Sequence, residues 1–358
     1  MRIAVLANLI QNAPTWEGMP EDQWDDLDGM KTINAIIKAL ESGGHEAQFF
    51  EASVLPPFNL VENLRAYQPD LCFNIAEGHF GDGREAQIPA LLEMLQIPYT
   101  GSKVLTLALT LDKPMTKRVL RYHDLPTPEF QVFSQADGMI DDDLLTDDGT
   151  ELRYPLFVKP SREGTGMGVS ASSIVHTVAE LREQLTYQLQ RYNQPILVER
   201  YIKGREITMG IVGNFEPTAA RRLDEHTLAI PKDLTFFPAM EINLEAYGES
   251  EAGLYTNRIK KGLSGEFFYQ CPADLSPELV AKLQQLTAAV FRVTGCHDVA
   301  RVDFRLDDEP YILEINPLPG LNPGYSDLCL EADAAGWSYE QLINTIVSLA
   351  AKRQNDAG

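Results

Sequence analysis

Residues 300–320 read ARVDFRLDDEPYILEINPLPG, and this stretch decides how the rest of the chain is interpreted. Two short apolar runs flank the polar segment 306–310, a composition typical of a β-hairpin. A turn centred on residues 308–309 places Asp303 opposite Glu314 on the partner strand. The predicted register therefore brings two carboxylates together.

Two further polar side chains belong to the same patch. Side chains alternate along a strand, so Arg301 shares a face with Asp303, and Asn316 shares a face with Glu314. Hard oxygen ligands at this density suit Mg²⁺, with Mn²⁺ as an alternative, and Mg²⁺ held by so few protein groups normally carries nucleotide phosphates. The competing interpretation is a surface hairpin whose charges face solvent, although Asp and Asn are poor strand residues without a local purpose.

Composition limits the classes of protein that fit. The chain has 358 residues, 44% of them hydrophobic, which is enough for two or three domains. Its net charge of −22 argues against a nucleic-acid partner. No apolar run approaches the ~20 residues that span a bilayer, so no membrane partner is expected. The four scattered cysteines are typical of a reducing compartment, and we expect a soluble cytoplasmic protein.

The first part of the chain alternates strand patterns with helix patterns. Strands are expected at residues 2–9, 46–51, 70–75 and 97–100, and helices at 30–42 and 84–95. Such alternation is typical of a parallel sheet with helices on both faces. We therefore expect an open α/β domain over residues 1–110.

The remainder mixes further strands and helices. Helices are expected at 111–124, 177–192, 276–294 and 339–351, and strands at 127–133, 155–160, 169–174, 195–202 and 205–212. Residues 141–148 are acidic and predict a solvated loop, whereas 236–265 have little regular pattern and predict a mobile loop. Residues 352–358 are expected to fray.

Three segments outside the hairpin carry candidate binding residues. The segment 77–85 (EGHFGDGRE) follows a predicted strand at the edge where parallel sheets bind ligands, and its charged residues suit a small zwitterion. An ordinary solvated connection is the alternative. The loop 162–168 (REGTGMG) follows the strand that carries Lys159, and its three glycines allow backbone N–H groups to surround a phosphate. A second strand at 169–174 would make this loop a hairpin lid, although a glycine-rich loop alone is weak evidence.

Two glutamates lie in strand patterns among apolar neighbours. Glu199 and Glu206 each need a partner if they are buried, and an adenine amino group or ribose hydroxyls would serve. Paired structural glutamates are an equally good explanation from the local sequence.

Taken in order, these segments resemble an ATP-grasp carboxylate–amine ligase, and most closely the D-alanine–D-alanine ligase family. The segments that carry the resemblance are EGHFGDGREAQIPALLEMLQIPYTGS (77–102), LDKPMTK (111–117), YPLFVKPSREGTGMGV (154–169), LVERYIKGREIT (197–208), ARVDF (300–304) and LEINPLPG (313–320). They cover nearly the whole chain from Glu77 onward, and six such segments in this order are highly specific.

The resemblance implies a fold and a reaction. The expected fold is an N-terminal open parallel sheet followed by a two-domain ATP-grasp part of α+β type. Its expected domains are a substrate domain at 1–110, a central subdomain with the glycine-rich phosphate lid at 111–205, and a C-terminal domain with the metal site and a cover loop (236–265) at 206–358. The implied reaction activates a carboxylate as an acyl phosphate, which an amine attacks to give an amide, ADP and phosphate.

The resemblance also assigns roles by position, and homodimers are common among the relatives. The assigned residues are Lys113, Lys159, Thr165 and Gly166 for ATP phosphates, Glu199 for adenine, Glu206 for ribose, Asp303, Glu314 and Asn316 for two Mg²⁺ ions, Arg301 for the oxyanion, Lys260 and Lys261 for the cover loop, and Glu77, His79, Arg84, Gly320 and Ser326 for the substrates.

The departures from the family pattern concern the amino-acid pockets. Residues 7–24 (ANLIQNAPTWEGMPEDQW) lack the Gly-Gly-x-Ser-x-Glu element whose glutamate holds the first D-alanine's ammonium. Lys260-Lys261-Gly262 has no tyrosine after the lysine, Thr165-Gly166 replaces a serine pair, and the C-terminal substrate serine is shifted to about Ser326. We therefore expect an ADP-forming ligase for other small, amino-acid-like substrates. The alternatives are an authentic D-alanine–D-alanine ligase of peptidoglycan synthesis, a nucleotide-binding protein without turnover, and another acyl-phosphate enzyme.

Overall fold

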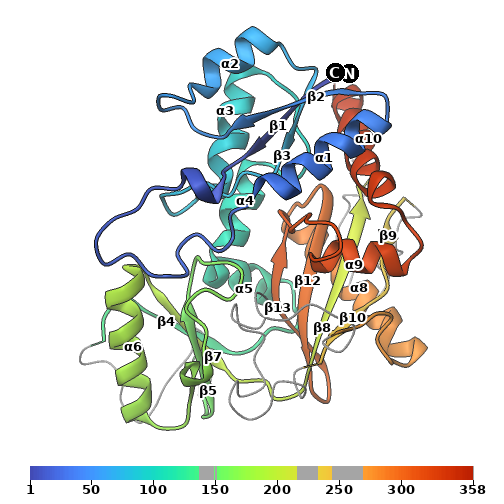
Figure 1. The fold of residues 1–358 in the computed structure, drawn as a ribbon. Coiled ribbons are helices and arrows are strands. Elements are labelled where there is room, and N and C mark those ends of the chain that lie inside the picture. Colours follow the sequence, from blue (N-terminus) through green and yellow to red (C-terminus); the bar gives the residue numbers. More distant parts are fainter. Residues whose placement is uncertain (137–148, 150, 216–232, 244–268, 358) are drawn as a thin grey trace.

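The computed structural model describes residues 1–136, 149, 151–215, 233–243 and 269–357. Three sheets organise these residues, one in each of the three predicted segments (Figure 1). The mixture of one parallel and two antiparallel sheets with covering helices confirms the predicted fold class. The division into three domains stays a prediction.

The N-terminal sheet is parallel and has the order β2-β1-β3. Its elements are β1 (Arg2–Ala7), α1 (Met30–Ser42), β2 (Glu46–Glu51), α2 (Leu60–Tyr67), β3 (Leu71–Asn74), the short 3₁₀ turn η2 (Arg84–Ala86) and α3 (Gln87–Leu95). The strand predicted at 97–100 is wrong, because Tyr99 makes only an isolated bridge to Cys72. The eight-residue α2 was not predicted, since it is too short to show a clear period.

The last helix packs against the first. Helix α10 (Tyr339–Ala357) shares one apolar core with β1 and α1. The contact is close, because a Cβ added at Gly43 would lie 2.0 Å from Asn344 Oδ1. The predicted fraying from residue 352 is wrong: Arg353 Nη2 lies 2.8 Å from Asp298 Oδ2 and anchors the end of the helix.

The central sheet is antiparallel and has the order β4-β7-β5-β6. Its strands are β4 (Phe130–Phe133), β5 (Leu156–Pro160), β6 (Ile174–Val175) and β7 (Ile196–Arg200), and the sheet is covered by α6 (Val178–Tyr192). The strand predicted at 169–174 is mostly wrong, because a 3₁₀ turn (Ala171–Ser173) precedes the two-residue β6. Gly168 has φ +74° and a Cβ there would meet Pro160 at 2.6 Å, so this part of the loop requires glycine.

Helices α4 (Val104–Leu111) and α5 (Lys113–Tyr122) replace the single helix predicted at 111–124. Asp112 adopts an extended backbone between them, and its side chain accepts a hydrogen bond from Met115 N. This N-cap begins α5 immediately before Lys113. The capping aspartate therefore fixes where that lysine enters the helix.

The C-terminal sheet is antiparallel and has the order β11-β10-β8-β12-β13, with β9 also paired to β8. Its elements are β8 (Arg205–Gly213), β9 (Thr235–Phe236), β10 (Met240–Ile242), β11 (Tyr269–Gln270), α8 (Pro277–Val293), β12 (Asp298–Leu306), β13 (Pro310–Asn316) and α9 (Asp327–Ala334). The loop predicted at 236–265 is wrong over its first part, where β9 ends and β10 forms. The rest of that loop, with Lys260 and Lys261, and the loop at 141–148 lie outside the described residues.

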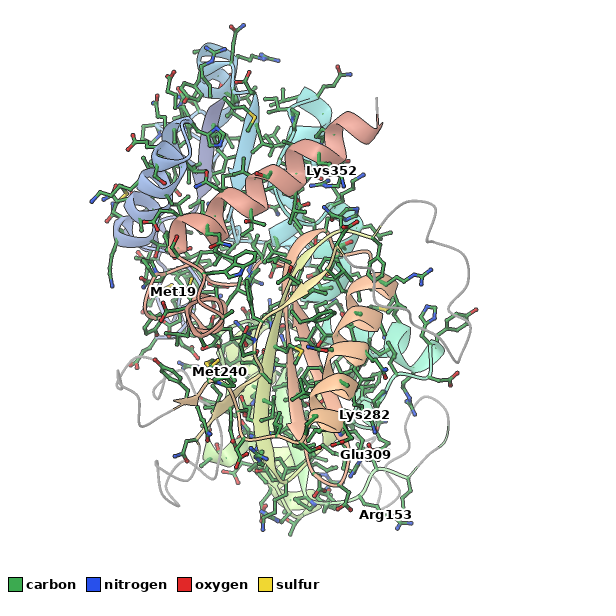
Figure 2. The ribbon with its side chains drawn as sticks, turned by 90° about the vertical axis from the view of Figure 1, so that its right-hand side faces the viewer. Met19, Arg153, Met240, Lys282, Glu309 and Lys352 are labelled. Atoms are coloured by element: carbon green, nitrogen blue, oxygen red, sulfur yellow. The ribbon has the colours of Figure 1, made fainter. Side chains whose placement is uncertain are left out.

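Helix α8 covers one face of this sheet through a shared apolar core. At the tip of the β12–β13 hairpin, Lys282 of α8 forms an ion pair with Glu309 (Figure 2). Within the part of the chain that the structure describes, no helix is both long enough and apolar enough to cross a membrane.

Candidate functional site

The β12–β13 hairpin has the register predicted from the sequence. Asp303 pairs with Glu314, and Arg301 pairs with Asn316. A register shift follows Asp303, so the ladder is irregular beside the charged patch. The hairpin therefore brings its four polar residues to one place.

Asp303 is held by several donors at once. Arg301 Nε and Nη2 donate to its two carboxylate oxygens, both at 2.9 Å. Asn316 Nδ2 and Thr208 Oγ1 also donate to it, at 2.9 and 2.7 Å. Burial acts to lower the pKa of Arg301, but Asp303 and Asp327 together raise that pKa well above its usual value. Arg301 is therefore a fixed positive charge beside the carboxylates.

Glu314 contacts the lysine that begins α5. Lys113 Nζ lies 3.2 Å from Glu314 Oε2 and donates to the backbone oxygen of Glu163 at 2.5 Å. Burial acts to raise the pKa of Glu314, but Lys113, Lys159 and Arg301 together outweigh it, and the net pKa is lowered. The carboxylate is therefore ionised at neutral pH.

Glu199 lies between two lysines. Its carboxylate oxygens are each 2.7 Å from an ammonium, one from Lys159 Nζ and the other from Lys117 Nζ. Although burial opposes ionisation, these two lysines lower the pKa of Glu199 to about 2. Lys117, which also donates to Thr127 Oγ1 at 2.8 Å, was not predicted as a site residue. It lies four residues after Lys113, so both lysines are on the same face of α5.

Two adjoining cavities contain most of the predicted site. The smaller has a volume of about 120 Å³ and the larger about 490 Å³. The predicted residues that line the smaller one are Lys113, Lys159, Gly166, Glu199, Glu206, Arg301, Asp303 and Glu314. The predicted residues that line the larger one are Glu77, Lys113, Thr165, Arg301, Glu314, Asn316, Gly320 and Ser326. Most of the residues that line the smaller cavity are those that the resemblance assigns to ATP and the metal, so we call this part of the site the nucleotide end.

Two predicted substrate residues do not line either cavity. Arg84 is buried behind the wall, where Nη2 lies 2.8 Å from Asp26 Oδ2 and 3.5 Å from Glu163 Oε2. His79 packs edge-on against Trp24, with ring centroids 5.3 Å apart. Their substrate roles stay predictions. Ser326, which does line the larger cavity, accepts a hydrogen bond from Asn322 N at 3.0 Å.

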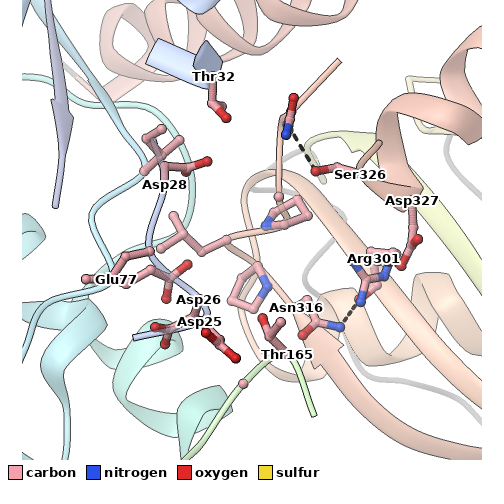
Figure 3. Close-up of a pocket in the computed structure, with 18 of the residues that line it drawn as sticks. Asp25, Asp26, Asp28, Thr32, Glu77, Thr165, Arg301, Asn316, Ser326 and Asp327 are labelled. Carbon is pink, nitrogen blue, oxygen red and sulfur yellow. Dashed lines mark hydrogen bonds and ion pairs between the residues drawn. The ribbon is translucent and has the colours of Figure 1, made fainter. Parts of the chain in front are cut away.

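The other end of the larger cavity is lined by carboxyl groups, and we call it the acidic end. Its members are Asp25, Asp26, Asp28, Glu77 and Glu85. Figure 3 shows the first four on one side of the cavity, across from Arg301, Asn316 and Asp327. Glu77 is a predicted site residue, and Glu85 belongs to the candidate segment 77–85. The three aspartates were not predicted, and they form an Asp-Asp-x-Asp sequence shortly before α1.

Burial and mutual repulsion shift the carboxyl groups of the acidic end. Burial, and then the charges of Glu85 and Asp26, raise the pKa of Glu77 well above its usual value. Burial raises the pKa of Glu85 to about 7, although Arg84 acts to lower it. Burial likewise raises the pKa of Asp28 to about 6, with Asp26 adding to the effect. This end therefore tends to retain protons near neutral pH.

The donor set at the hairpin fits Mg²⁺. Among the residues that the structure describes, no three His, Cys, Asp or Glu side chains form a metal-binding group. Asp303, Glu314 and Asn316 instead offer two carboxylates and one amide. Mg²⁺ commonly takes one or two carboxylates and completes its octahedron with water and substrate phosphates, so this sparse set is suitable.

The sequence matches one protein family over most of its length. Residues 119–348 match the family model described as the D-ala D-ala ligase C-terminus. The chain is 33% identical to the D-alanine–D-alanine ligase of Syntrophotalea carbinolica, over 91% of this chain and 92% of that protein. It is 34% identical to the D-alanine–D-alanine ligase of Cupriavidus pinatubonensis, over 88% and 85%. It is also 33% identical to the uncharacterized protein y4sG of Sinorhizobium fredii, over 99% and 98%.

A solved structure has the same fold. The D-alanine–D-alanine ligase from Bacillus anthracis, crystallised in complex with ATP, superimposes with a TM-score of 0.71 at 24% identity. The superposition covers 100% of both chains. The predicted ATP-grasp architecture is confirmed.

Proposed function

Because the chain belongs to the D-alanine–D-alanine ligase family, we propose that it joins a carboxylate and an amine other than two D-alanines. Family membership makes it an ATP-dependent, ADP-forming carbon–nitrogen ligase, and the family uses ATP with a divalent metal. The observation that carries the proposal is the larger cavity itself. It joins a set of residues suited to phosphate and metal to an end lined by carboxyl groups.

In this proposal the nucleotide end binds ATP and two Mg²⁺ ions. Lys113 and Lys159 neutralise the phosphates, and Glu206 holds the ribose. Asp303, Glu314 and Asn316 hold the metal, which when bound neutralises phosphate charge. Thr165 and Gly166 of the glycine-rich loop are proposed to contact the phosphates through the backbone.

Glu199 can bind the adenine amino group only if one of its carboxylate oxygens is released from a lysine. Both of its carboxylate oxygens contact lysines, so one of these contacts must be exchanged for the adenine amino group. Lys159 is the better candidate to move, because it lines the smaller cavity, whereas Lys117 is buried behind it and also bonded to Thr127.

The proposed reaction has two steps. The substrate carboxylate accepts the terminal phosphoryl group of ATP, and ADP leaves; the amine then attacks the acyl phosphate, forming an amide and releasing phosphate. Arg301 suits the oxyanion of the second step, because its pKa is raised and it lines both cavities. Lys260 and Lys261 are proposed to belong to a cover that excludes water.

A second candidate function is favoured by the names of the relatives. The relatives from Syntrophotalea carbinolica and Cupriavidus pinatubonensis are named D-alanine–D-alanine ligases. The second proposal is therefore that this chain is itself a D-alanine–D-alanine ligase, which requires that its pockets accept D-alanine. A cytoplasmic location, the three domains and a homodimer belong to either proposal. The net charge of −22 supports the absence of a nucleic-acid partner.

Phosphate release tests these functions. The purified protein is incubated with ATP and Mg²⁺, and phosphate is followed across single amino acids, amines and their pairs, in both stereochemistries. Release with a pair other than D-alanine supports the first proposal. Release with D-alanine alone supports the second. Nucleotide binding without release for any pair contradicts both and leaves a nucleotide-binding protein without turnover.

A further inference from the structure

The glycine-rich loop (162–168) is held at its start by two side chains from outside the loop. Arg162 N donates a hydrogen bond to Gln194 Oε1 at 2.7 Å. Arg84 Nη1 donates to the backbone oxygen of Arg162, also at 2.7 Å. Both backbone polar groups of the first loop residue are therefore bonded to these two side chains.

The same two side chains also hold the carboxylate of the next loop residue. Gln194 Nε2 donates to Glu163 Oε1 at 2.7 Å, and Arg84 Nη2 lies 3.5 Å from Glu163 Oε2. The side chains of Arg84 and Glu163 are only 8% and 9% exposed, so this ion pair is buried. Lys113 adds a hydrogen bond to the backbone oxygen of Glu163. We call Arg84 and Gln194 the loop clamp.

The three residues that follow the clamped pair have backbone donors to offer. The N–H groups of Gly164, Thr165 and Gly166 donate no hydrogen bond to any residue that the structure describes. Thr165 and Gly166 have φ of +53° and +74°, and successive N–H groups in such a turn can form a concave surface for an anion. Gly164 and Thr165 line the larger cavity, and Gly166 lines the smaller one.

A loop with three glycines in five residues has many accessible conformations, so it needs anchors if its N–H groups are to point at a ligand. We propose that Arg84 and Gln194 are positioning residues that hold the glycine-rich loop in the conformation that binds the phosphates of the nucleotide. This role rests on the ligase function proposed above, and Arg84 acts through the loop instead of contacting the substrate. A loop that is ordered before the nucleotide arrives removes an entropic cost from binding.

Arg84 also connects the loop to the N-terminal part of the chain. It belongs to η2, whereas the loop follows β5 of the central sheet. Its Nη2 lies 2.8 Å from Asp26 Oδ2, and Asp26 lines the larger cavity. A lysine in its place would keep the charge, but its compact ammonium lacks the fork that reaches Arg162, Glu163 and Asp26 together. Arg84→Lys should therefore loosen the loop at constant charge.

Nucleotide binding tests the loop clamp without a known amino-acid substrate. Titration calorimetry on the full chain measures the affinity for the non-hydrolysable ATP analogue AMP-PNP with Mg²⁺. A displacement titration against the same analogue measures the affinity for adenosine, which has no phosphate. Arg84→Lys should weaken AMP-PNP binding about tenfold, the effect of one charged hydrogen bond, and leave adenosine binding unchanged. A merely structural role would change the folded fraction, or both affinities by the same factor.

Gln194→Met tests the other half of the clamp, and it decides the question if Arg84→Lys lowers the folded fraction. It removes both hydrogen bonds of Gln194 without a change of charge and should also weaken AMP-PNP binding about tenfold, with adenosine unaffected. Arg65→Lys on α2 and Gln190→Met on α6 are the matched controls at exposed positions and should change neither affinity. Full AMP-PNP affinity in a folded clamp variant, or an equal loss of adenosine affinity, would overturn the proposal.

Phosphate release separates this inference from the proposed function. With a substrate pair that supports release, Arg84→Lys should lower kcat/KM for ATP about tenfold as well. Weaker AMP-PNP binding in the clamp variants, without phosphate release for any pair in the wild-type protein, refutes the ligase but retains the loop clamp. Phosphate release combined with full AMP-PNP affinity in Arg84→Lys retains the ligase and refutes the loop clamp.

Discussion

At the nucleotide end of the site Glu199, Glu314 and Asp303 each contact a lysine or an arginine, whereas at the acidic end several carboxylates share one arginine. Glu199 has Lys117 and Lys159, and Glu314 has Lys113. At the acidic end, Arg84 contacts Asp26 only from behind the cavity wall. The carboxylates named in the first region have counter-ions, whereas in the second the described carboxyl groups outnumber the described cations.

The pKa values of the carboxyl groups are shifted in opposite directions at the two ends. The pKa of Glu199 is lowered to about 2, and the pKa of Asp28 is raised to about 6. A region whose carboxylates already have counter-ions suits a ligand that a whole family binds, such as a nucleotide. An uncompensated region penalises ligands of the wrong charge, which is how a pocket gains specificity.

The largest expected effect is at the hairpin. Asp303→Ala should lower kcat about 10³-fold or more, because Asp303 is a proposed ligand of Mg²⁺, and a bound metal would supply several kcal/mol of transition-state stabilisation. Mg²⁺-dependent nucleotide affinity should fall as well, as measured by calorimetry. Asp308→Ala, in the exposed turn of the same hairpin, is the matched control. Full activity in Asp303→Ala would contradict the metal assignment.

The next effect is on stability at the nucleotide end. Lys117→Met should lower the free energy of unfolding by about 3 kcal/mol, because it removes one partner of a buried ion pair. Urea unfolding measures this change. Lys38→Met, on the exposed face of α1, should change it by less than about 0.5 kcal/mol. Equal stability of the two variants would show that Lys159 alone compensates Glu199.

The two ends should respond to pH in opposite ways. Asp28 and Glu85 bind protons more tightly in the folded state, so the ligand-free protein should lose stability as pH rises through about 6 to 7. Glu199 has a lowered pKa, so its contribution is present above about pH 4.5 and is lost as pH falls toward about 2.

Glu77→Gln tests the upper branch of this profile. Removing this buried charge, which Glu85 and Asp26 also repel, should raise Tm at pH 8 by about 2–4 °C and leave Tm at pH 5 nearly unchanged. A thermal melt series measures both values. A Tm gain of the same size at pH 5 would mean that charge repulsion is not the cause.

The smallest effect is that of salt. Added NaCl should raise Tm at pH 8 slightly, because ions entering the cavity screen the acidic end, whereas the buried Lys117–Glu199 pair is screened much less. The gain should be smaller in Glu77→Gln. An undiminished gain in that variant would assign the salt effect to the protein surface.

Much of the compensated region could be predicted from sequence, because its geometry is local. Strand alternation and a polar turn were sufficient to pair Asp303 with Glu314, since a slip of one residue would turn apolar side chains outward. The pairing of Lys117 with Glu199 was not predictable in the same way. It joins a helix to a strand far along the chain, and no periodicity reports it.

The acidic end shows where sequence reasoning failed. Residues 25–28 lie in an irregular segment and meet Glu77 only through the tertiary fold. These aspartates match no family element in the sequence, so nothing local marks them as site residues. The sequence likewise predicts a frayed end at Arg353, because its partner Asp298 lies on a different element.

The packing of α10 on α1 has a consequence for biosynthesis. Ile33, Ile36 and Leu40 leave the ribosome about 300 residues before Leu342 and Ile346, which share their core. At about 5–20 residues per second, that apolar face waits roughly 15–60 s for its cover. During that interval the nascent chain exposes the part of the apolar face of α1 that α10 later covers.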